Sequence, residues 1–198
     1  MADKLYLVDI DVATSFSEEF TNFFTDFVCE VPTAILTSRS ASALPPDWVT
    51  HARYVFASDA NEVYVSNKLR YKNIIQPTHE VRKWIESTQL ASALYLHKVH
   101  VKADPYTSAS RVREFNELFS EFKATSCTGG FCITDDSDAR RVIPALISSN
   151  YYIRFITPIG LVGSVNYSLA QAVNTRGSVF HISTEAQLRE LLLFLQEK

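Results

Sequence analysis

Short apolar runs alternate along this chain with stretches whose apolar residues recur at helical spacing, and this alternation limits the possible folds more than any other feature. Residues 5–8 and 34–36 form such runs, which are typical of strands buried in a parallel sheet. Between them, phenylalanines recur at helical intervals, which predicts a helix that packs its aromatic face on the sheet: Phe16, Phe20, Phe23, Phe24 and Phe27. The order strand, helix, strand predicts a mostly parallel sheet with helices on both faces.

Further apolar runs extend this pattern to the end of the chain. They lie at 53–57, 131–133, 152–156 and 179–182, and we expect all of them to be strands. A leucine-rich helix, capped at Thr184, follows the last run. The fold class expected from this order is α/β, with a three-layer Rossmann-like core and a mostly parallel sheet.

Polar side chains follow the carboxyl ends of several of these predicted strands. They are Asp9, Asp11, Thr37, Asp135 and Asp136. Ligands of parallel α/β sheets bind beyond this edge, and clustered carboxylates repel one another unless a cation compensates them. Oxygen-rich acidic clusters suit Mg²⁺, and a hydroxyl beside them suits a phosphate. The alternative is that each aspartate only caps the next helix. For the whole set we prefer a magnesium and phosphate site.

Composition excludes several other classes of protein. The 198 residues fit one α/β domain or a core with a small insert, and the net charge of −3 does not indicate a nucleic-acid binder. The basic segment 68–72 is short and is better explained as a solvated strand or loop. Three scattered cysteines do not form a disulfide framework, and no apolar run reaches the length of a membrane span. We therefore expect a cytoplasmic protein.

Three segments, in the correct order, resemble the motifs of haloacid dehalogenase-like (HAD) phosphatases. Residues 5–11, Leu-Tyr-Leu-Val-Asp-Ile-Asp, resemble the first motif, an apolar strand that ends in Asp-x-Asp. Residues 34–40 are similar to the second motif, and residues 131–138 are similar to the acidic fourth motif. Residues 54–64 add a resemblance to the trehalose- and sucrose-phosphate phosphatases of this superfamily.

The resemblance implies a role for each matching residue. Asp9 would be the nucleophile that accepts the phosphoryl group. Asp11 would protonate the leaving oxygen and later activate water. Thr37 and Ser38 would bind phosphoryl oxygens.

The resemblance also implies a magnesium site and a cation beside the phosphate. The carboxylates that would hold Mg²⁺ are Asp9, Asp11, Asp135 and Asp136. Where the family carries a lysine, in its third motif, this chain has Arg111, which would bind the phosphate. Lys98 and Lys102, on the preceding strand, are the alternatives for this cation.

The domain boundaries that the resemblance implies divide the chain into a core and an insert. Residues 1–60 and 105–198 would form the HAD-like core domain, and residues 61–104 a small α/β cap. A cap of this size is short for the subgroup, which implies a large substrate or a partner that completes the lid.

The function implied is Mg²⁺-dependent hydrolysis of a phosphomonoester through an aspartyl-phosphate. The substrate would be a small phosphorylated molecule, most simply a sugar phosphate. The acid at position 11 suits phosphatases and phosphomutases, whereas the haloacid dehalogenases and P-type ATPases of the superfamily lack it. The alternative is a noncatalytic protein of the same fold that binds a ligand or a partner. It rests on the reduced cap and on Val12, Ala13, Thr134 and Arg111, which depart from the family pattern at positions lining the site.

Overall fold

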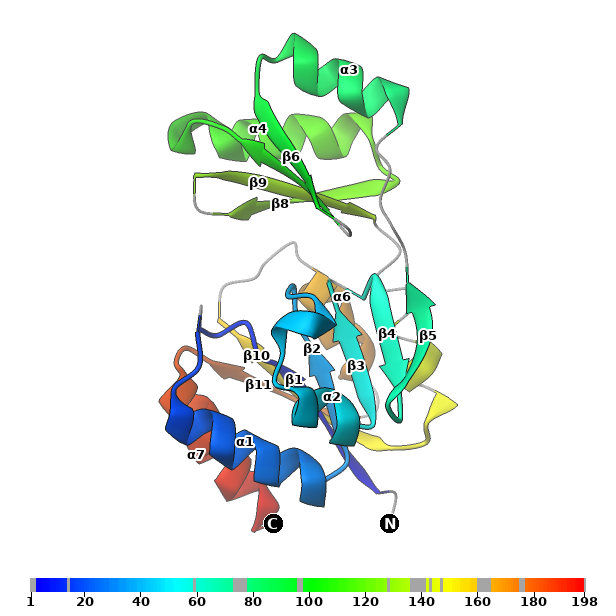
Figure 1. Ribbon diagram of the computed structural model, residues 1–198, viewed down its shortest axis with the longest axis vertical. Helices are drawn as coiled ribbons and strands as arrows, with labels where there is room; N and C mark the ends of the chain where they lie inside the picture. The colour runs from blue at the N-terminus through cyan, green and yellow to red at the C-terminus, as the bar shows by residue number, and fades with distance from the viewer. Residues whose placement is uncertain are drawn as a thin grey trace. The chain divides into compact units, whose positions relative to one another are not determined.

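The computed structural model divides the chain into two compact units (Figure 1). It describes residues 3–13, 15–58, 60–72, 78–95, 98–127, 129–135, 142, 144–146, 148–159, 165–174 and 177–197. The first unit comprises Met1–Lys72 and Ala139–Lys198, and the second comprises Asn73–Asp138. The predicted boundaries of the insert, 61–104, are therefore wrong. The reason is that the hairpin after residue 61 extends the sheet of the first unit, whereas residues 105–135 pair and pack within the second.

The sheet of the first unit has seven strands in the part of the chain that the structure describes, in the order β11-β10-β1-β2-β3-β4-β5. The strands are β1 (Lys4–Asp9), β2 (Thr33–Leu36), β3 (Tyr54–Ala57), β4 (Glu62–Val65), β5 (Lys68–Lys72), β10 (Tyr152–Pro158) and β11 (Gly177–Ile182). The five strands from β11 to β3 are parallel, and β4 and β5 are antiparallel. The mostly parallel sheet predicted from the sequence is confirmed.

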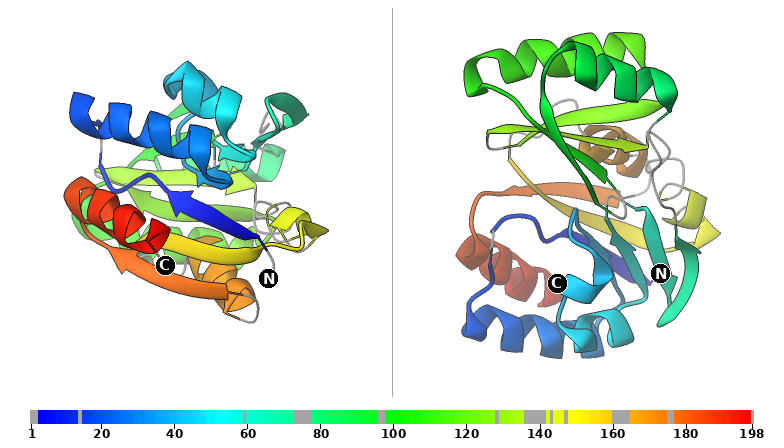
Figure 2. Two further views of the ribbon diagram at one scale, coloured as in Figure 1. Left: turned by 90° about the horizontal axis from the view of Figure 1, so that it is seen from below. Right: turned by 45° about the horizontal axis from the view of Figure 1, so that its top comes forward.

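Helices cover both faces of this sheet. One face carries α1 (Glu18–Glu30), α2 (Pro46–His51) and α7 (Glu185–Gln196), together with the short 3₁₀ helix η1 (Ala41–Ala43). The other face carries α6 (Val165–Val173) and the buried side chains of Val142 and Leu146. Figure 2 (left) shows α1 and α6 on opposite sides of the central strands. The three-layer architecture is thus confirmed.

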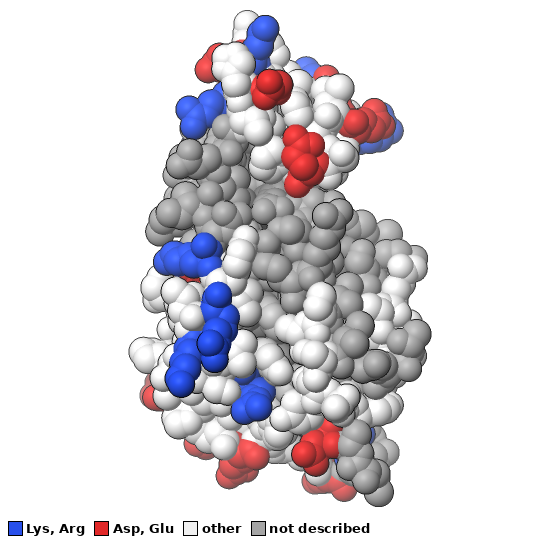
Figure 3. All heavy atoms as spheres, turned by 90° about the vertical axis from the view of Figure 1, so that its right-hand side faces the viewer, with Lys and Arg blue, Asp and Glu red and all other residues white. Residues whose placement is uncertain are grey.

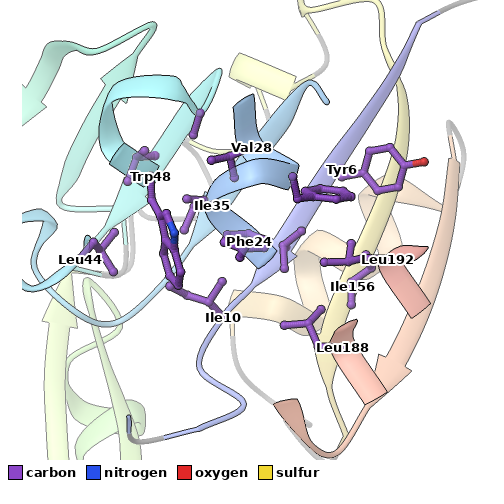
Figure 4. Close-up of a cluster of buried hydrophobic side chains, with 14 of the residues drawn as sticks. Tyr6, Ile10, Phe24, Val28, Ile35, Leu44, Trp48, Ile156, Leu188 and Leu192 are labelled. Carbon is purple, nitrogen blue, oxygen red and sulfur yellow. The ribbon is translucent and has the colours of Figure 1, made fainter. Parts of the chain in front are cut away.

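The aromatic stripe of α1 packs into the core, as its spacing predicts. The ring of Trp48, on α2, lies edge-on to Phe24 with ring centroids 4.7 Å apart. Phe20 and Phe24 stack on each other at 5.5 Å. Figure 4 shows Trp48 and Phe24 in one cluster with Ile10, Ile35 and Leu192. Burying one such side chain contributes roughly 1.5–3 kcal/mol, so this stripe stabilises the fold and needs no functional explanation. The helix begins after Ser17, whose hydroxyl accepts from the Phe20 N–H.

The edge strand β5 is exposed along its whole length. Its Lys and Arg side chains gather along the edge of the sheet that Figure 3 shows. Ser66 and Asn67, both with positive φ, form the tight turn that joins β4 to β5. Charged side chains on an edge strand discourage pairing with other chains. The basic segment is therefore a solvated strand, as expected.

The second unit is a four-stranded antiparallel sheet with two helices packed on it. Its strand order is β6-β7-β9-β8, formed by β6 (Ala91–Tyr95), β7 (Lys98–Lys102), β8 (Phe122–Cys127) and β9 (Gly130–Asp135). The helices are α3 (His79–Ser87) and α4 (Pro105–Leu118). Val81, Phe115 and Phe131 form its core with Trp84 packed against them. No helix in the described residues is long and apolar enough to cross a membrane.

The strand β9 does not join the parallel sheet, which corrects the placement expected for residues 131–133. It pairs antiparallel with β7, with Phe131 opposite Val101, and antiparallel with β8. The strand beside β1 is instead β10, with Val8 opposite Ile156. Both runs are short and apolar, so the local pattern alone could not decide which one lies beside β1.

Candidate active site

Asp9 is the last residue of β1, at the carboxyl end of a central strand. The residue is only 3% exposed. One carboxylate oxygen, Oδ1, accepts the backbone N–H of Asp11 at 2.9 Å, because the chain turns immediately after the strand. Burying a carboxylate is costly unless it is hydrogen-bonded or paired. The local fold therefore holds a buried, hydrogen-bonded carboxylate at this edge of the sheet.

The carboxylate of Asp11 is bound by three donors from the segment that follows β2. Its Oδ1 accepts the Thr37 hydroxyl at 2.6 Å, and its Oδ2 accepts the Ser38 N–H at 2.6 Å. The guanidinium of Arg39 forms an ion pair with Oδ1 at 3.2 Å. These contacts join the turn after β1 to the end of β2.

Arg39 also holds the turn after β1 from its other side. Its Nη2 donates to the carbonyl of Ala13, and its guanidinium lies over the ring of Phe16, 4.6 Å from the centroid. Residues 34–40, which resemble the second family motif, contain this arginine, but nothing in the sequence indicates that it contacts Asp11 rather than solvent. Among the described residues, Arg39 is thus the cation that contacts Asp11.

The segment after β2 is fastened to the turn between β3 and β4. The Ser58 N–H donates to the Arg39 carbonyl at 2.7 Å, and the Ala41 N–H donates to Glu62 Oε2 at 2.8 Å. Glu62 is buried, and its Oε1 forms an ion pair with Lys72 Nζ at 3.0 Å. The hydrogen bond to Glu62 and its charge raise the pKa of Lys72 above its ordinary value. Glu62 is a positioning group that the sequence did not single out.

The other neighbour of β1, strand β10, brings no carboxylate to the site. The register of β1 and β10 runs to Val8–Ile156, and continuing it by one residue places Thr157 next to Asp9. Pro158 ends the strand. The sequence from residue 139 to residue 184 contains no Asp or Glu. An acidic partner for Asp9 from this part of the chain is therefore excluded.

The structure brings together four of the residues predicted for the site, Asp9, Asp11, Thr37 and Ser38. Arg111 lies on α4 in the second unit, where its Nη1 forms an ion pair with Glu114 at 2.7 Å. Asp135 ends β9 in the second unit, so the strand-end argument that placed it beside Asp9 does not hold. Asp136 lies outside the described residues.

The described residues of the first unit bring two carboxylates, Asp9 and Asp11, to the site predicted for magnesium. Among the residues that the structure describes, no group of three or more His, Cys, Asp or Glu side chains is placed to hold a metal ion. Of the two carboxylates present, Asp11 already has the Arg39 cation. Asp9 and Asp11 by themselves do not fit the four-carboxylate magnesium site that the sequence predicts.

The fold and the acidic strand end define a class, the open α/β proteins that bind ligands at the carboxyl edge of a parallel sheet. No protein family and no curated protein matches the sequence, but solved structures match the fold. A haloacid dehalogenase-like hydrolase from Bacteroides thetaiotaomicron aligns with a TM-score of 0.69 and 10% identity, covering 98% of this chain and 99% of that one.

Two further structures extend this comparison. A trehalose-6-phosphate phosphatase related protein aligns with a TM-score of 0.59 and 12% identity, over 98% of this chain and 100% of that one. An IMP-nucleotidase from Plasmodium falciparum aligns with a TM-score of 0.63 and 9% identity, over 96% of this chain and 69% of that one. At such low identity the likeness shows the fold. This chain has the fold of the HAD-like hydrolases.

Proposed function

We propose that the protein hydrolyses phosphomonoesters, with Asp9 as the nucleophile. The observation that carries this proposal is the setting of Asp9, a buried carboxylate held at the end of a central parallel strand by the N–H of Asp11. A second carboxylate, a hydroxyl and a backbone N–H gather directly beside it. The fold is also one whose solved examples include proteins named as a hydrolase, a phosphatase-related protein and a nucleotidase.

The proposed chemistry has two steps. A carboxylate oxygen of Asp9 attacks phosphorus, and the bond from phosphorus to the ester oxygen breaks. Asp11 gives a proton to the departing oxygen, then takes one from the water that attacks the aspartyl-phosphate and releases inorganic phosphate. Asp11 must first leave its present donors. Thr37 and the Ser38 N–H, released from Asp11, then become donors for phosphoryl oxygens.

The substrate in this proposal is a small phosphorylated molecule, and a sugar phosphate is the class we put first. One solved relative in fold is related to a trehalose-6-phosphate phosphatase, whereas another acts on a nucleotide, so the fold itself accommodates both classes. We assign the choice between them to the second unit, the inserted sheet and helices of residues 73–138.

A magnesium requirement is a separate part of the proposal. The carboxylates that we propose for Mg²⁺ are those of the sequence motifs, Asp9, Asp11, Asp135 and Asp136. Mg²⁺ bound there would neutralise charge on the phosphoryl group. The comparison of activity in Mg²⁺ and in EDTA tests this part without affecting the assignment of Asp9.

The test is a hydrolysis assay on an aryl phosphate, a panel of sugar phosphates and a nucleotide monophosphate. Asp9→Asn keeps the shape of the side chain and removes the nucleophile, so we expect kcat/KM to fall by about 1,000-fold or more. Asp26→Asn, at an exposed position of α1, is the matched control and should keep the parental activity. Equal activity of Asp9→Asn and the parent would refute the mechanism.

A second candidate function is noncatalytic binding of a phosphorylated ligand on the same fold. It is favoured by β10, which places Thr157 and Pro158 beside the site and no carboxylate. If no substrate is hydrolysed while beryllium fluoride or phosphate raises the melting temperature of the parent and not of Asp9→Asn, this second function replaces the first.

A further inference from the structure

The hydroxyl of Thr157 is buried and has no hydrogen-bond partner among the described residues. The residue is only 3% exposed. A buried hydroxyl left unsatisfied costs free energy, so native proteins almost always pair such groups with protein or with another ligand. Valine has nearly the same shape and would avoid this cost. The hydroxyl at position 157 therefore requires an explanation other than packing.

The position of Thr157 connects it to the candidate active site. Leu7 of β1 lies opposite Phe155 of β10, and both side chains belong to the core on the α6 side of the sheet. Side chains alternate along strands, so Asp9 and Thr157, two residues further on, lie on that same face. Neighbouring strands are about 4.8 Å apart. The unpaired hydroxyl thus borders the carboxylate that we propose as the nucleophile.

The chemistry of this hydroxyl fits an oxyanion. A threonine hydroxyl carries no charge, so it adds no repulsion toward a phosphate that already lies beside Asp9. Its single O–H can donate to one phosphoryl oxygen, and hydrogen bonds to charged acceptors are the stronger ones. The donors on the β2 side, Thr37 and Ser38, already bind Asp11. Thr157 is a donor that no described protein group already uses.

We propose that Thr157 is a ligand-binding residue of the Asp9 site, whose hydroxyl donates to an oxygen of the phosphoryl group held against Asp9. The ligand class is a phosphate monoester or orthophosphate. This inference rests on the proposed function, because it takes the group bound at Asp9 to be a phosphate. It adds a binding group on β10, the side of the site where the sequence indicated nothing.

The experiment measures the dissociation constant of inorganic phosphate by calorimetry, with the full chain and with Asp9→Asn to locate the site. Thr157→Val removes the hydroxyl and keeps the bulk, and we expect the dissociation constant to rise about tenfold or more. Thr157→Ser keeps the hydroxyl and should stay within about threefold of the parent. The melting temperature without phosphate should be unchanged or higher in Thr157→Val, because no bond of the free protein is lost.

Thr33→Val is the matched control. Thr33 is also a buried threonine at a strand end, but its hydroxyl donates to the Val31 carbonyl at 2.9 Å and it starts β2, whereas Thr157 lies near the end of β10. The Thr33→Val substitution should lower the melting temperature and leave phosphate binding unchanged. If Thr157→Val fails to fold, Thr157→Ala makes the same deletion without the branched side chain.

The outcomes separate this inference from the proposed function. Phosphate binding at the parental affinity in Thr157→Val or Thr157→Ala overturns the role of Thr157, while hydrolysis that depends on Asp9 still supports the proposed function. A parent that binds no phosphate overturns the inference, and the hydrolysis assay then decides the proposed function independently. A tenfold loss in Thr157→Val with binding kept in Thr157→Ser supports the inference.

Discussion

The two sides of Asp9 differ in how completely their polar groups are paired. On the β2 side, the Thr37 hydroxyl, the Ser38 N–H and the Arg39 guanidinium all bind Asp11. On the β10 side, the buried hydroxyl of Thr157 has no partner in the described part of the chain. The difference indicates that the β2 side positions Asp11, whereas the β10 side is arranged to bind a ligand from outside the protein. Substitutions on the two sides should therefore affect stability and binding in opposite ways.

Removing the cation on the β2 side should give the largest loss of stability. Arg39→Met deletes the ion pair with Asp11 and the contact with the Ala13 carbonyl, while keeping an apolar side chain against Phe16. The pair is partly buried, with side chains 20% and 27% exposed. The contribution of this ion pair should lie between that of a surface pair and that of a fully buried pair. We therefore expect a loss of about 2 kcal/mol in the free energy of unfolding. Urea denaturation measures it.

Arg189→Met is the matched control for this prediction. Arg189 also forms an ion pair at 3.2 Å, with Glu19, and also lies over an aromatic ring, that of Phe23 at 5.5 Å. These contacts join α7 to α1, away from Asp9, and Glu19 is largely exposed. The loss should be below about 1 kcal/mol. Equal losses for the two arginines would contradict the special role of Arg39.

Two threonine-to-valine substitutions test the comparison directly, with a smaller expected effect. Thr37→Val removes a buried hydroxyl that donates to Asp11 and accepts from the Arg39 N–H, so it should destabilise the protein by about 1–2 kcal/mol. Thr157→Val removes a hydroxyl with no partner in the described residues and should cost nothing or stabilise slightly. Denaturation of both variants in the absence of phosphate measures the difference. The comparison fails if Thr157→Val destabilises as much as Thr37→Val.

The β2 side could be predicted from the sequence because its residues lie close together along the chain. The segments 5–11 and 34–40 are adjacent parallel strands joined by one helix, so their strand ends must meet at one edge. The core strands, the parallel sheet and the packing role of the phenylalanines follow from the same local patterns. Asp9, Asp11, Thr37 and Ser38 lie together for this reason.

The β10 side could not be predicted because its pairing joins segments far apart in sequence. The run 131–133 followed by aspartates has the local pattern of a core strand with an acidic end, but its pairing with β7 places it in the second unit. The strand that does lie beside β1 ends in Thr157 and Pro158, which carry no acidic signal. The sequence does contain one indication. Residues 139–184 contain no Asp or Glu, so a core strand in this range cannot be followed by an acidic motif.

The smallest predicted effect concerns the anchor of the β2 side and appears only at alkaline pH. Glu62 accepts the Ala41 N–H and pairs with Lys72, and this pairing raises the pKa of Lys72 above its ordinary value of 10.5. Since the folded state holds this proton more tightly than the unfolded state, the pair stabilises the fold below pH 10.5 and loses its contribution as the pH rises further. Glu62→Gln keeps an acceptor for Ala41 but removes the charge. The parent should therefore be more stable than Glu62→Gln by a constant amount between about pH 7 and 9.5, and the difference should shrink above that range.

Tyr6 must be accounted for in this experiment, because burial raises its pKa above 10.0. The unfolded state then loses the tyrosine proton first, so the free energy of unfolding falls above pH 10.0 for this reason as well. Both proteins contain Tyr6, on β1 and away from Glu62, and its contribution cancels in the difference between parent and variant. Denaturation at a series of pH values up to about 11.5 therefore isolates the Glu62–Lys72 pair. A difference that stays constant through the alkaline range would show that the Lys72 ion pair does not contribute to the stability that Glu62 provides.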